Sequence, residues 1–267
     1  MHSIFNTNVH QLNCLGTNVG VTMVKIAVLV KQVPDTNSKI QISGDRVDLS
    51  SVKMVMSPYD EFAIENAMQH KENAGGTVSA ITVGGQSADK VLKDAKAIGV
   101  DEIIRIDCNE YLDSNALQTI ISSVISEGGY EVVYCGKSAA DTGAGSTGPG
   151  VAEKLGWASI SNATEISFNE LITANSPAEG GNAVVSVSSP VVISCDKGSV
   201  KVRKPNVKGI MMAKRAQVEV KSVEIPSTSV SIVSHTLPPA KPPGKKFEGA
   251  QSAQSVVQLL RDEANII

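Results

Sequence analysis

The sequence has few aromatic residues, little net charge and no long apolar run. Aromatic residues make up 3% of its 267 residues, and 24 basic against 27 acidic residues leave a formal net charge of −3. Nucleic-acid binders usually carry a strong basic excess, so this balance argues against nucleic acid as a partner. A membrane span needs roughly 18 uninterrupted apolar residues, which no stretch approaches, so we expect no membrane span.

Cysteines are few and scattered. Cys14, Cys108, Cys135 and Cys195 lie far apart and form no C-x-x-C pair, which indicates neither a zinc site nor a disulfide framework. The last three lie in or at the end of apolar runs, where small buried side chains are typical. A reducing compartment fits this usage, and we predict a cytoplasmic location.

Side chains for acid–base or nucleophilic catalysis are scarce as well. None of the four histidines, His2, His10, His70 and His235, stands beside a plausible nucleophile. No carboxylate pair is spaced like a general acid and base, and metal ligands do not cluster. We therefore predict no catalytic side chain and no metal site, and for His70 a place on a helix surface or in a partly buried position.

What the sequence does contain is an alternation of strands and helices. Near-continuous apolar runs predict strands at 24–30, 77–85, 102–107 and 131–136, each covered on both faces. Between them, helical spacing predicts a helix from Ser57 to the Gly75-Gly76 stop, one capped by Ser87, and one at 114–127. This order predicts a doubly wound, mostly parallel α/β sheet of the Rossmann type.

The remainder of the chain differs in composition. Short alternating runs at 159–196, with Gly180-Gly181 as a hairpin turn, predict strands added to the sheet or lying beside it. Prolines between 238 and 243 predict an extended arm, which ends in a helix from Ala253 to Ala264. Residues 1–22 lack the pattern of a secretory signal. We interpret 1–22 as a disordered extension, 23–225 as the α/β domain and 226–267 as an arm that docks on a partner.

The Gly-, Ser- and Thr-rich loop Gly136–Gly150 follows the fourth strand. In open parallel sheets, ligands bind beyond the carboxyl ends of the strands, where this loop lies. Backbone amides at the helix start near Thr147 suit a phosphate, and Asp141 suits a ribose or adenine group. The alternative is a surface loop without function. If a nucleotide binds, the lack of catalytic groups indicates that the protein either carries a redox cofactor or has a purely structural role.

Five motifs, in consistent order, resemble segments of electron transfer flavoprotein beta subunits. They are Lys25–Asp35, Ser57–Glu61, Ala97–Asp101, the loop Gly136–Asp141 with Thr147-Gly148-Pro149, and Gly209–Lys214. The resemblance implies an adenine nucleotide alpha hydrolase-like form of the fold. It also implies a heterodimer with an alpha subunit that binds FAD.

The same resemblance implies a nucleotide in the beta subunit, either AMP in housekeeping members or a second FAD in electron-bifurcating members. Val33-Pro34-Asp35-Thr36 resembles the bifurcating branch. That branch implies NADH as the electron donor or acceptor, and ferredoxin or flavodoxin and a flavin-dependent dehydrogenase as partners. Two alternatives stay open: a non-bifurcating subunit with structural AMP, and a universal-stress-type ATP-binding module.

Matching residue by residue, the resemblance implies a set of cofactor contacts and one partner contact. Val207 takes the place of the hydrophobic anchor in a loop that recognises dehydrogenases. The segment before it, Lys201–Asn206, departs from the family pattern, which implies a divergent dehydrogenase. The implied cofactor-binding residues are Leu29, Lys31, Pro34, Asp35, Thr36, Ser57, Asp60, Val83, Gly84, Asp141, Thr142, Gly143, Ser146, Thr147 and Gly148.

Overall fold

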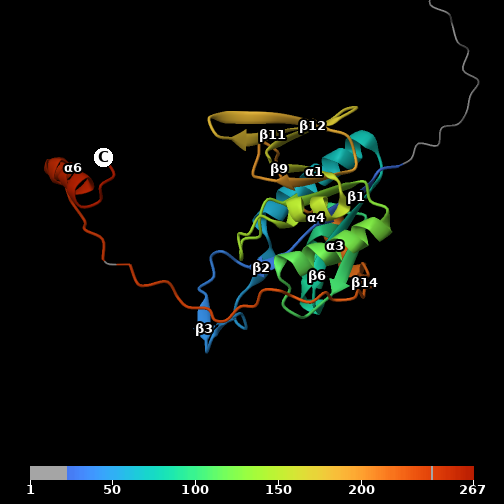
Figure 1. Ribbon diagram of the computed structural model, residues 1–267, viewed down its shortest axis with the longest axis horizontal. Helices are drawn as coiled ribbons and strands as arrows, with labels where there is room; N and C mark the ends of the chain where they lie inside the picture. Colours follow the sequence, from blue (N-terminus) through green and yellow to red (C-terminus); the bar gives the residue numbers. More distant parts are fainter. Residues whose placement is uncertain (1–22, 242) are drawn as a thin grey trace, which may run out of the picture. The chain divides into compact units, whose positions relative to one another are not determined.

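The computed structural model describes residues 23–241 and 243–267 (Figure 1). The chain divides into two compact units. Within the described residues, the first comprises 23–40 together with Leu49–Ile232, and the second comprises Gln41–Asp48 with Val233–Ile267. The interpretation of residues 1–22, which include His2, His10 and Cys14, lies outside the described residues.

The first unit is built on a seven-stranded sheet in which every neighbouring pair is parallel. The predicted doubly wound α/β sheet is confirmed. The strand order is β14-β7-β6-β1-β8-β13-β9, so β1 lies between β6 and β8. The strands are β1 (Lys25–Leu29), β6 (Thr77–Gly84), β7 (Glu102–Asp107), β8 (Val132–Gly136), β9 (Ala158–Ala163), β13 (Val191–Cys195) and β14 (Glu219–Lys221).

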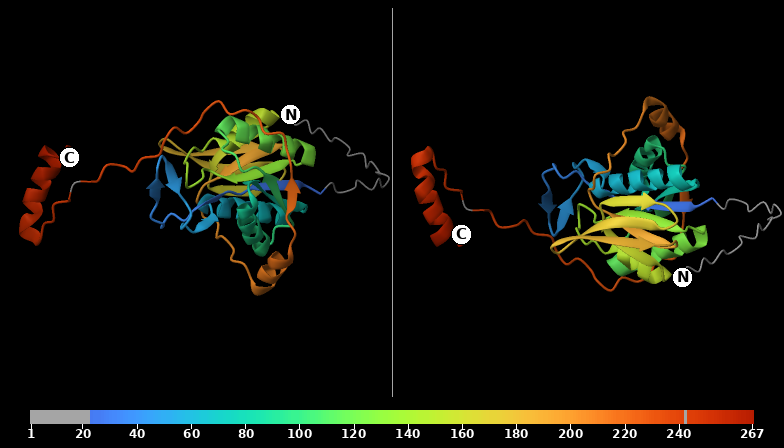
Figure 2. Two further views of the ribbon diagram at one scale, coloured as in Figure 1. Left: turned by 90° about the horizontal axis from the view of Figure 1, so that it is seen from below. Right: turned by 90° about the horizontal axis from the view of Figure 1, so that it is seen from above.

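Helices cover both faces of this sheet (Figure 2). The helices are α1 (Pro58–Ala74), α2 (Asp89–Ile98), α3 (Ser114–Gly128) and α4 (Thr147–Leu155). Alternate residues of β1 enter two separate cores: Ile26 and Val28 pack with α1 and α2, whereas Ala27 and Leu29 pack with α3 and α4. A strand buried on both faces has no polar side, which explains the unbroken apolar run in the sequence.

A small antiparallel sheet belongs to the same unit. It consists of β10 (Glu165–Phe168), β11 (Ile172–Ala178) and β12 (Gly181–Val187). The predicted hairpin is present, but its two-residue loop is Glu179-Gly180, with Gly180 at φ 78° and Gly181 already in β12. Both predicted arrangements occur, because β9 and β13 join the main sheet while β10–β12 form a sheet of their own. A further pair is β2 (Gln32–Pro34) with β5 (Met54–Met56).

Two details of the helices differ from the expectation. Ser87 does not cap a helix: it lies inside the 3₁₀ turn Gln86–Ala88 that precedes α2, and its hydroxyl donates to Gln32 Oε1 at 3.2 Å. Because this 3₁₀ turn extends to Ala88, the N-cap position of α2 falls on Ala88 and not on Ser87. In addition, the segment of the motif Gly209–Lys214, for which no helix is predicted, forms helix α5 (Val207–Arg215). The side chain of Asn206 caps this helix by accepting the Gly209 N–H at 2.8 Å.

The buried polar and sulfur groups of the first unit are small or paired. His70 is buried, with Nδ1 2.9 Å from the Tyr134 hydroxyl and its ring stacked on Phe168, and burial lowers its pKa to about 4. Cys108, Cys135 and Cys195 are buried and free, which confirms the prediction of buried small side chains.

The second unit joins the hairpin β3 (Gln41–Ser43) and β4 (Arg46–Asp48) to the C-terminal segment. The His235 N–H donates to Asp45 O at 3.0 Å, and Arg46 Nη1 donates to Val233 O at 2.9 Å. After the 3₁₀ turn Ala250–Ser252, α6 (Ala253–Asp262) ends two residues before the predicted boundary and has no buried residue. Throughout the described residues, no helix combines the length and apolar character that a membrane crossing requires.

Candidate nucleotide site at the carboxyl edge of the sheet

A cavity of about 210 Å³ lies at the carboxyl ends of β1, β6 and β8. From β1 the chain builds β6 and β7 on one side and then returns to place β8 on the other, so β1 and β8 flank a topological switch point. Such a point opens a crevice between neighbouring strand ends, where open α/β sheets bind ligands. The cavity is lined by the strand ends, the loop after β8 and the first turns of α3.

The loop between β8 and α4 presents backbone N–H groups beside this cavity. Gly143 and Gly145 adopt left-handed φ angles of 63° and 64°, on either side of Ala144. Among the described residues, the N–H groups from Ala144 to Gly148 have no hydrogen-bond acceptor, and Pro149 has no N–H. Alternating backbone conformations followed by a helix N-terminus create a concave, positively polarised surface. This surface can accept an anion such as a phosphate group.

Asp60, the third residue of α1, holds the two strand ends that flank the switch point. Its carboxylate is 6% exposed and accepts the N–H of Lys31 at 2.7 Å and the N–H of Gly136 at 3.2 Å. Burial raises the pKa of Asp60 to about 7, although both hydrogen bonds act to lower it. Asp60 is therefore partly protonated at neutral pH, which limits the negative charge that a phosphate would meet.

Asp141 and Lys31 face each other across the mouth of the site. Lys31 Nζ lies 2.9 Å from Asp141 Oδ1 and 2.8 Å from Oδ2, and Asp141 also accepts the Thr142 N–H at 2.8 Å. The loop lysine, Lys137, instead contacts Asp196 at 2.9 Å and lies over the Tyr59 ring at 4.8 Å. The charge of Asp141 is thus offset by Lys31, while the ammonium of Lys137 is engaged by Asp196 and Tyr59.

The structure brings together most of the residues predicted to bind a cofactor. Gly84 ends β6, one of the strands at this edge, and Ser57 precedes α1 with a buried hydroxyl that has no partner among the described residues. Asp141, Gly143, Ser146 and Gly148 belong to the loop and helix start that border the cavity. Those that line the cavity itself are Leu29, Lys31, Asp60, Val83, Thr142 and Thr147.

Pro34, Asp35 and Thr36 do not line this cavity. Asp35 and Thr36 line a separate cavity of about 510 Å³, together with residues of α2 and of the segment Val202–Pro205, and Pro34 ends β2. Asp35 accepts the Asn37 N–H at 3.0 Å, and this bond lowers the pKa of Asp35. The Asp35 carboxylate therefore stabilises the local turn to which it belongs.

The apolar wall of the cavity was missed by the sequence reasoning. Tyr111 and Leu112 precede α3, and Leu117 and Ile121 lie on its first two turns. The sequence did contain a signal, because Leu117 and Ile121 are apolar residues four positions apart in the helix predicted at 114–127. A helix that follows the carboxyl end of a strand begins at that edge of the sheet. Its first turns therefore face any ligand that binds there.

Fold and site together define a doubly wound α/β protein with an anion-accepting cavity at its switch point. The sequence matches the electron transfer flavoprotein domain family over residues 46–226. The chain belongs to the electron transfer flavoprotein family, among its beta subunits. This confirms the family inferred from the five motifs, and it does not support the universal-stress-type alternative.

Curated relatives share most of their length with this chain. It is 31% identical over 253 residues to the electron transfer flavoprotein subunit beta of Bacillus subtilis (strain 168), covering 90% of this chain and 98% of the relative. It is 32% identical over 227 residues to the subunit beta of Syntrophomonas wolfei, covering 84% and 90%. The acryloyl-CoA reductase electron transfer subunit gamma of Anaerotignum propionicum is 29% identical over 248 residues, covering 84% and 92%.

Proposed function

We propose that this chain pairs with an electron transfer flavoprotein alpha subunit and passes electrons between flavin and a flavin-dependent dehydrogenase. Membership of the family supports this proposal. The observation that carries the nucleotide site is the row of unpartnered N–H groups from Ala144 to Gly148 beside an apolar cavity. That combination suits a ligand with both an anionic and a flat apolar part.

The proposed ligand is FAD. The N–H groups from Ala144 to Gly148 would hold its diphosphate, Asp141 and Lys31 its ribose or adenine polar groups, and the wall around Leu117 and Ile121 its adenine ring. A bound flavin supplies hydride acceptance and one-electron transfer. The protein side chains bind and orient the cofactor, and Asp60 and Lys31 set the charge around it.

The finer proposal is electron bifurcation, in which NADH exchanges a hydride with this flavin. A flavin bound here would supply this chemistry, with ferredoxin or flavodoxin and, beyond the alpha subunit, the dehydrogenase as the electron-transfer partners. The resemblance of Val33–Thr36 to the bifurcating branch supports this. One observation favours the non-bifurcating alternative with structural AMP: Asp35 and Thr36 line a cavity other than the one beside the loop.

Counting cofactors separates these two proposals. The heterodimer with its alpha subunit is purified and denatured, FAD is measured by absorbance, and adenine nucleotides are separated by chromatography. Two FAD per heterodimer is the expected result. One FAD with one AMP would overturn bifurcation in favour of the alternative. ATP without flavin would contradict the electron-transfer proposal as a whole.

Two exposed apolar surfaces are proposed as contacts with protein partners. Val257 and Leu260 of α6 are 45% and 37% exposed, and we assign this helix to the alpha subunit. Val207, 76% exposed at the first position of α5, is assigned to the dehydrogenase. A cytoplasmic location completes the proposal, on the basis of the scattered cysteines.

A further inference from the structure

The segment between β13 and α5 has no helix or strand and few hydrogen bonds. At its start, the Asp196 N–H donates to Ala163 O at 2.8 Å, and Ser199 Oγ donates to Glu165 Oε1 at 3.0 Å. Within the described chain, every hydrogen bond of residues 200–205 belongs to Arg203. The hydrogen bonding of residues 200–205 therefore depends on one residue.

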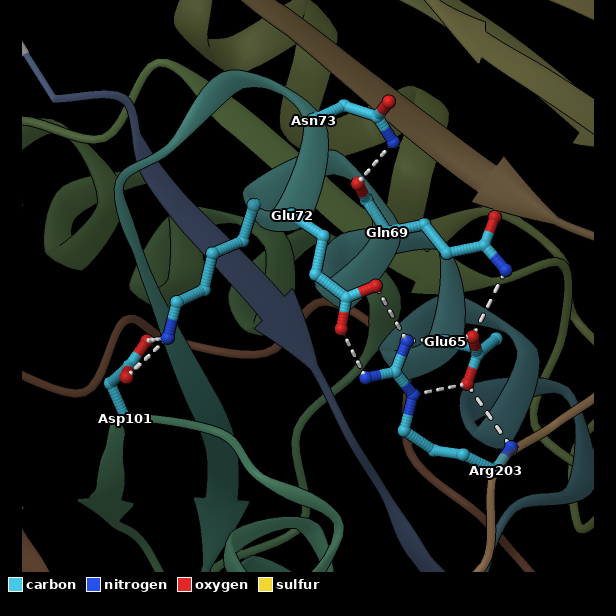
Figure 3. A network of polar contacts seen from close by, with 7 residues as sticks. Glu65, Gln69, Glu72, Asn73, Asp101 and Arg203 are labelled. Atoms are coloured by element: carbon cyan, nitrogen blue, oxygen red, sulfur yellow. Dashed lines mark hydrogen bonds and ion pairs between the residues drawn. The ribbon is translucent and has the colours of Figure 1, made fainter.

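Arg203 binds two carboxylates on α1 (Figure 3). Its Nε and Nη2 donate to the two oxygens of Glu65 at 2.7 and 2.9 Å, and its backbone N–H donates to Glu65 Oε2 at 3.1 Å. Its Nη1 and Nη2 donate to the oxygens of Glu72 at 2.6 and 3.2 Å. Glu65 and Glu72 lie two helical turns apart and share one face of α1. The guanidinium thus fastens the segment to a rigid helix at two points.

The chemistry of this contact requires an arginine. Glu65 is 4% exposed and also accepts from Gln69 Nε2 at 3.0 Å. Burial alone would raise the pKa of Glu65, but the bonds from Arg203 and Gln69 outweigh burial and lower it. A buried carboxylate without its partner is costly, and the single ammonium of lysine cannot form two forked contacts.

The segment leads directly into the exposed surface around Val207. α5 itself is seated on α2, since a Cβ at Gly209 would lie 2.3 Å from Ala97 O. Lys201 and Lys204 are exposed and have no ion-pair partner among the described residues. Loss of the Arg203 contacts would release residues 200–205 and leave α5 with its Asn206 cap in place.

We propose that Arg203 is a positioning residue that holds segment 200–205, and with it the approach to Val207, in the conformation that a protein partner recognises. The inference rests on the proposed function, in which Val207 contacts a dehydrogenase. Pre-ordering a binding segment removes an entropy cost from association. Arg203 therefore acts on partner binding and leaves cofactor binding and electron transfer within the complex unchanged.

The test uses the heterodimer with its alpha subunit and two measurements. Hydrogen exchange follows the N–H of residue 203, the one amide of residues 200–205 that donates a hydrogen bond within the described chain, and steady-state kinetics give kcat and the KM for the heterodimer. The dehydrogenase is the member of a panel of flavin-dependent dehydrogenases for which the wild-type heterodimer has the lowest KM. The variants are Arg203→Lys and the double variant Arg203→Met with Glu65→Gln, which avoids an uncompensated buried carboxylate. The control is Lys71→Met, which removes the Lys71–Asp101 ion pair of 2.5 Å from the same helix.

We expect faster exchange of the residue-203 N–H and a KM raised roughly fivefold or more in both Arg203 variants, since ordering several residues then opposes binding. kcat and flavin content stay at the wild-type values, and Lys71→Met changes neither exchange in this segment nor KM. Unchanged exchange, or faster exchange with an unchanged KM, overturns the inference. Val207→Ala separates the two proposals: if its KM is unchanged, the assignment of this surface to the dehydrogenase fails, whatever the exchange at Arg203 shows.

Discussion

Asp60 connects the sheet to the electrostatics of the site, because one buried carboxylate accepts N–H groups from the ends of both β1 and β8. Lys31 then offsets Asp141 at the cavity mouth. The arrangement leaves the N–H groups of the loop as the strongest unpaired donors beside the cavity. Their positive polarisation, together with two restrained carboxylates, makes an anionic ligand acceptable there.

The pKa of Asp60 gives stability a pH dependence with a definite sign. Burial raises this pKa from 3.8 to about 7, so between these values the folded state binds more protons than the unfolded state. Stability from this group is therefore present at low pH and falls as pH rises towards 7. Over the full window the effect is on the order of 4 kcal/mol.

Asp60→Asn removes this titration. At pH 5 the variant is expected to be less stable than wild type, because one strand-end N–H loses its acceptor, and the difference in unfolding free energy narrows towards pH 8. Urea unfolding of both proteins between pH 5 and 8 measures the difference. Parallel stability curves for the two proteins would show that Asp60 does not titrate in this window.

At the scale of elements, the loop Gly136–Ser146 sets up the site through its backbone. Gly145 has φ 64°, a conformation that costs most other residues about 1 kcal/mol. Gly145→Ala is expected to turn the adjacent N–H groups away from the cavity and weaken nucleotide retention about tenfold, which is about 1.4 kcal/mol. Retention is measured as nucleotide content of the heterodimer after dialysis.

Gly180→Ala is the matched control for this loop. Gly180 also has a left-handed φ, 78°, and a Cβ there would meet nothing within 4 Å. The control should lose a similar amount of stability and keep its nucleotide. Equal nucleotide loss in both variants would indicate general destabilisation and contradict the assignment of the loop amides.

Helix α6 has no buried residue, and Val257 and Leu260 of its apolar stripe are exposed within the described chain. Leu260→Asp is expected to weaken association with the alpha subunit by at least tenfold, because a charge in an apolar contact must be desolvated. Gln258→Glu, on the opposite side of the helix, should associate like wild type. Size-exclusion chromatography of mixed subunits at micromolar concentrations gives the measurement. Normal association of Leu260→Asp would exclude this stripe from the interface.

For the whole molecule, the order of strands and helices could be predicted because its signals are local. The runs at β1, β6, β7 and β8 are buried and largely apolar on both faces, and the breaks between them carry Gly and Pro. The 3₁₀ turn at Ser87 and the helix α5 were not predicted from the sequence. Helix α5 depends on tertiary packing against α2 and on the side-chain cap from Asn206. Of the site, the loop and its strand ends were predicted, whereas the apolar wall was not.

By itself, the sequence determined the α/β class, the position of the Gly136–Gly150 loop after a strand and the motifs that identify the family. Each of these depends on residues close together along the chain. Only the tertiary structure decided that β13 lies between β8 and β9, that Asp35 and Thr36 line a different cavity, and that Arg203 meets Glu65 across 138 positions of sequence. Such contacts leave no periodic signal, because they depend on which chain segments the folded core brings together.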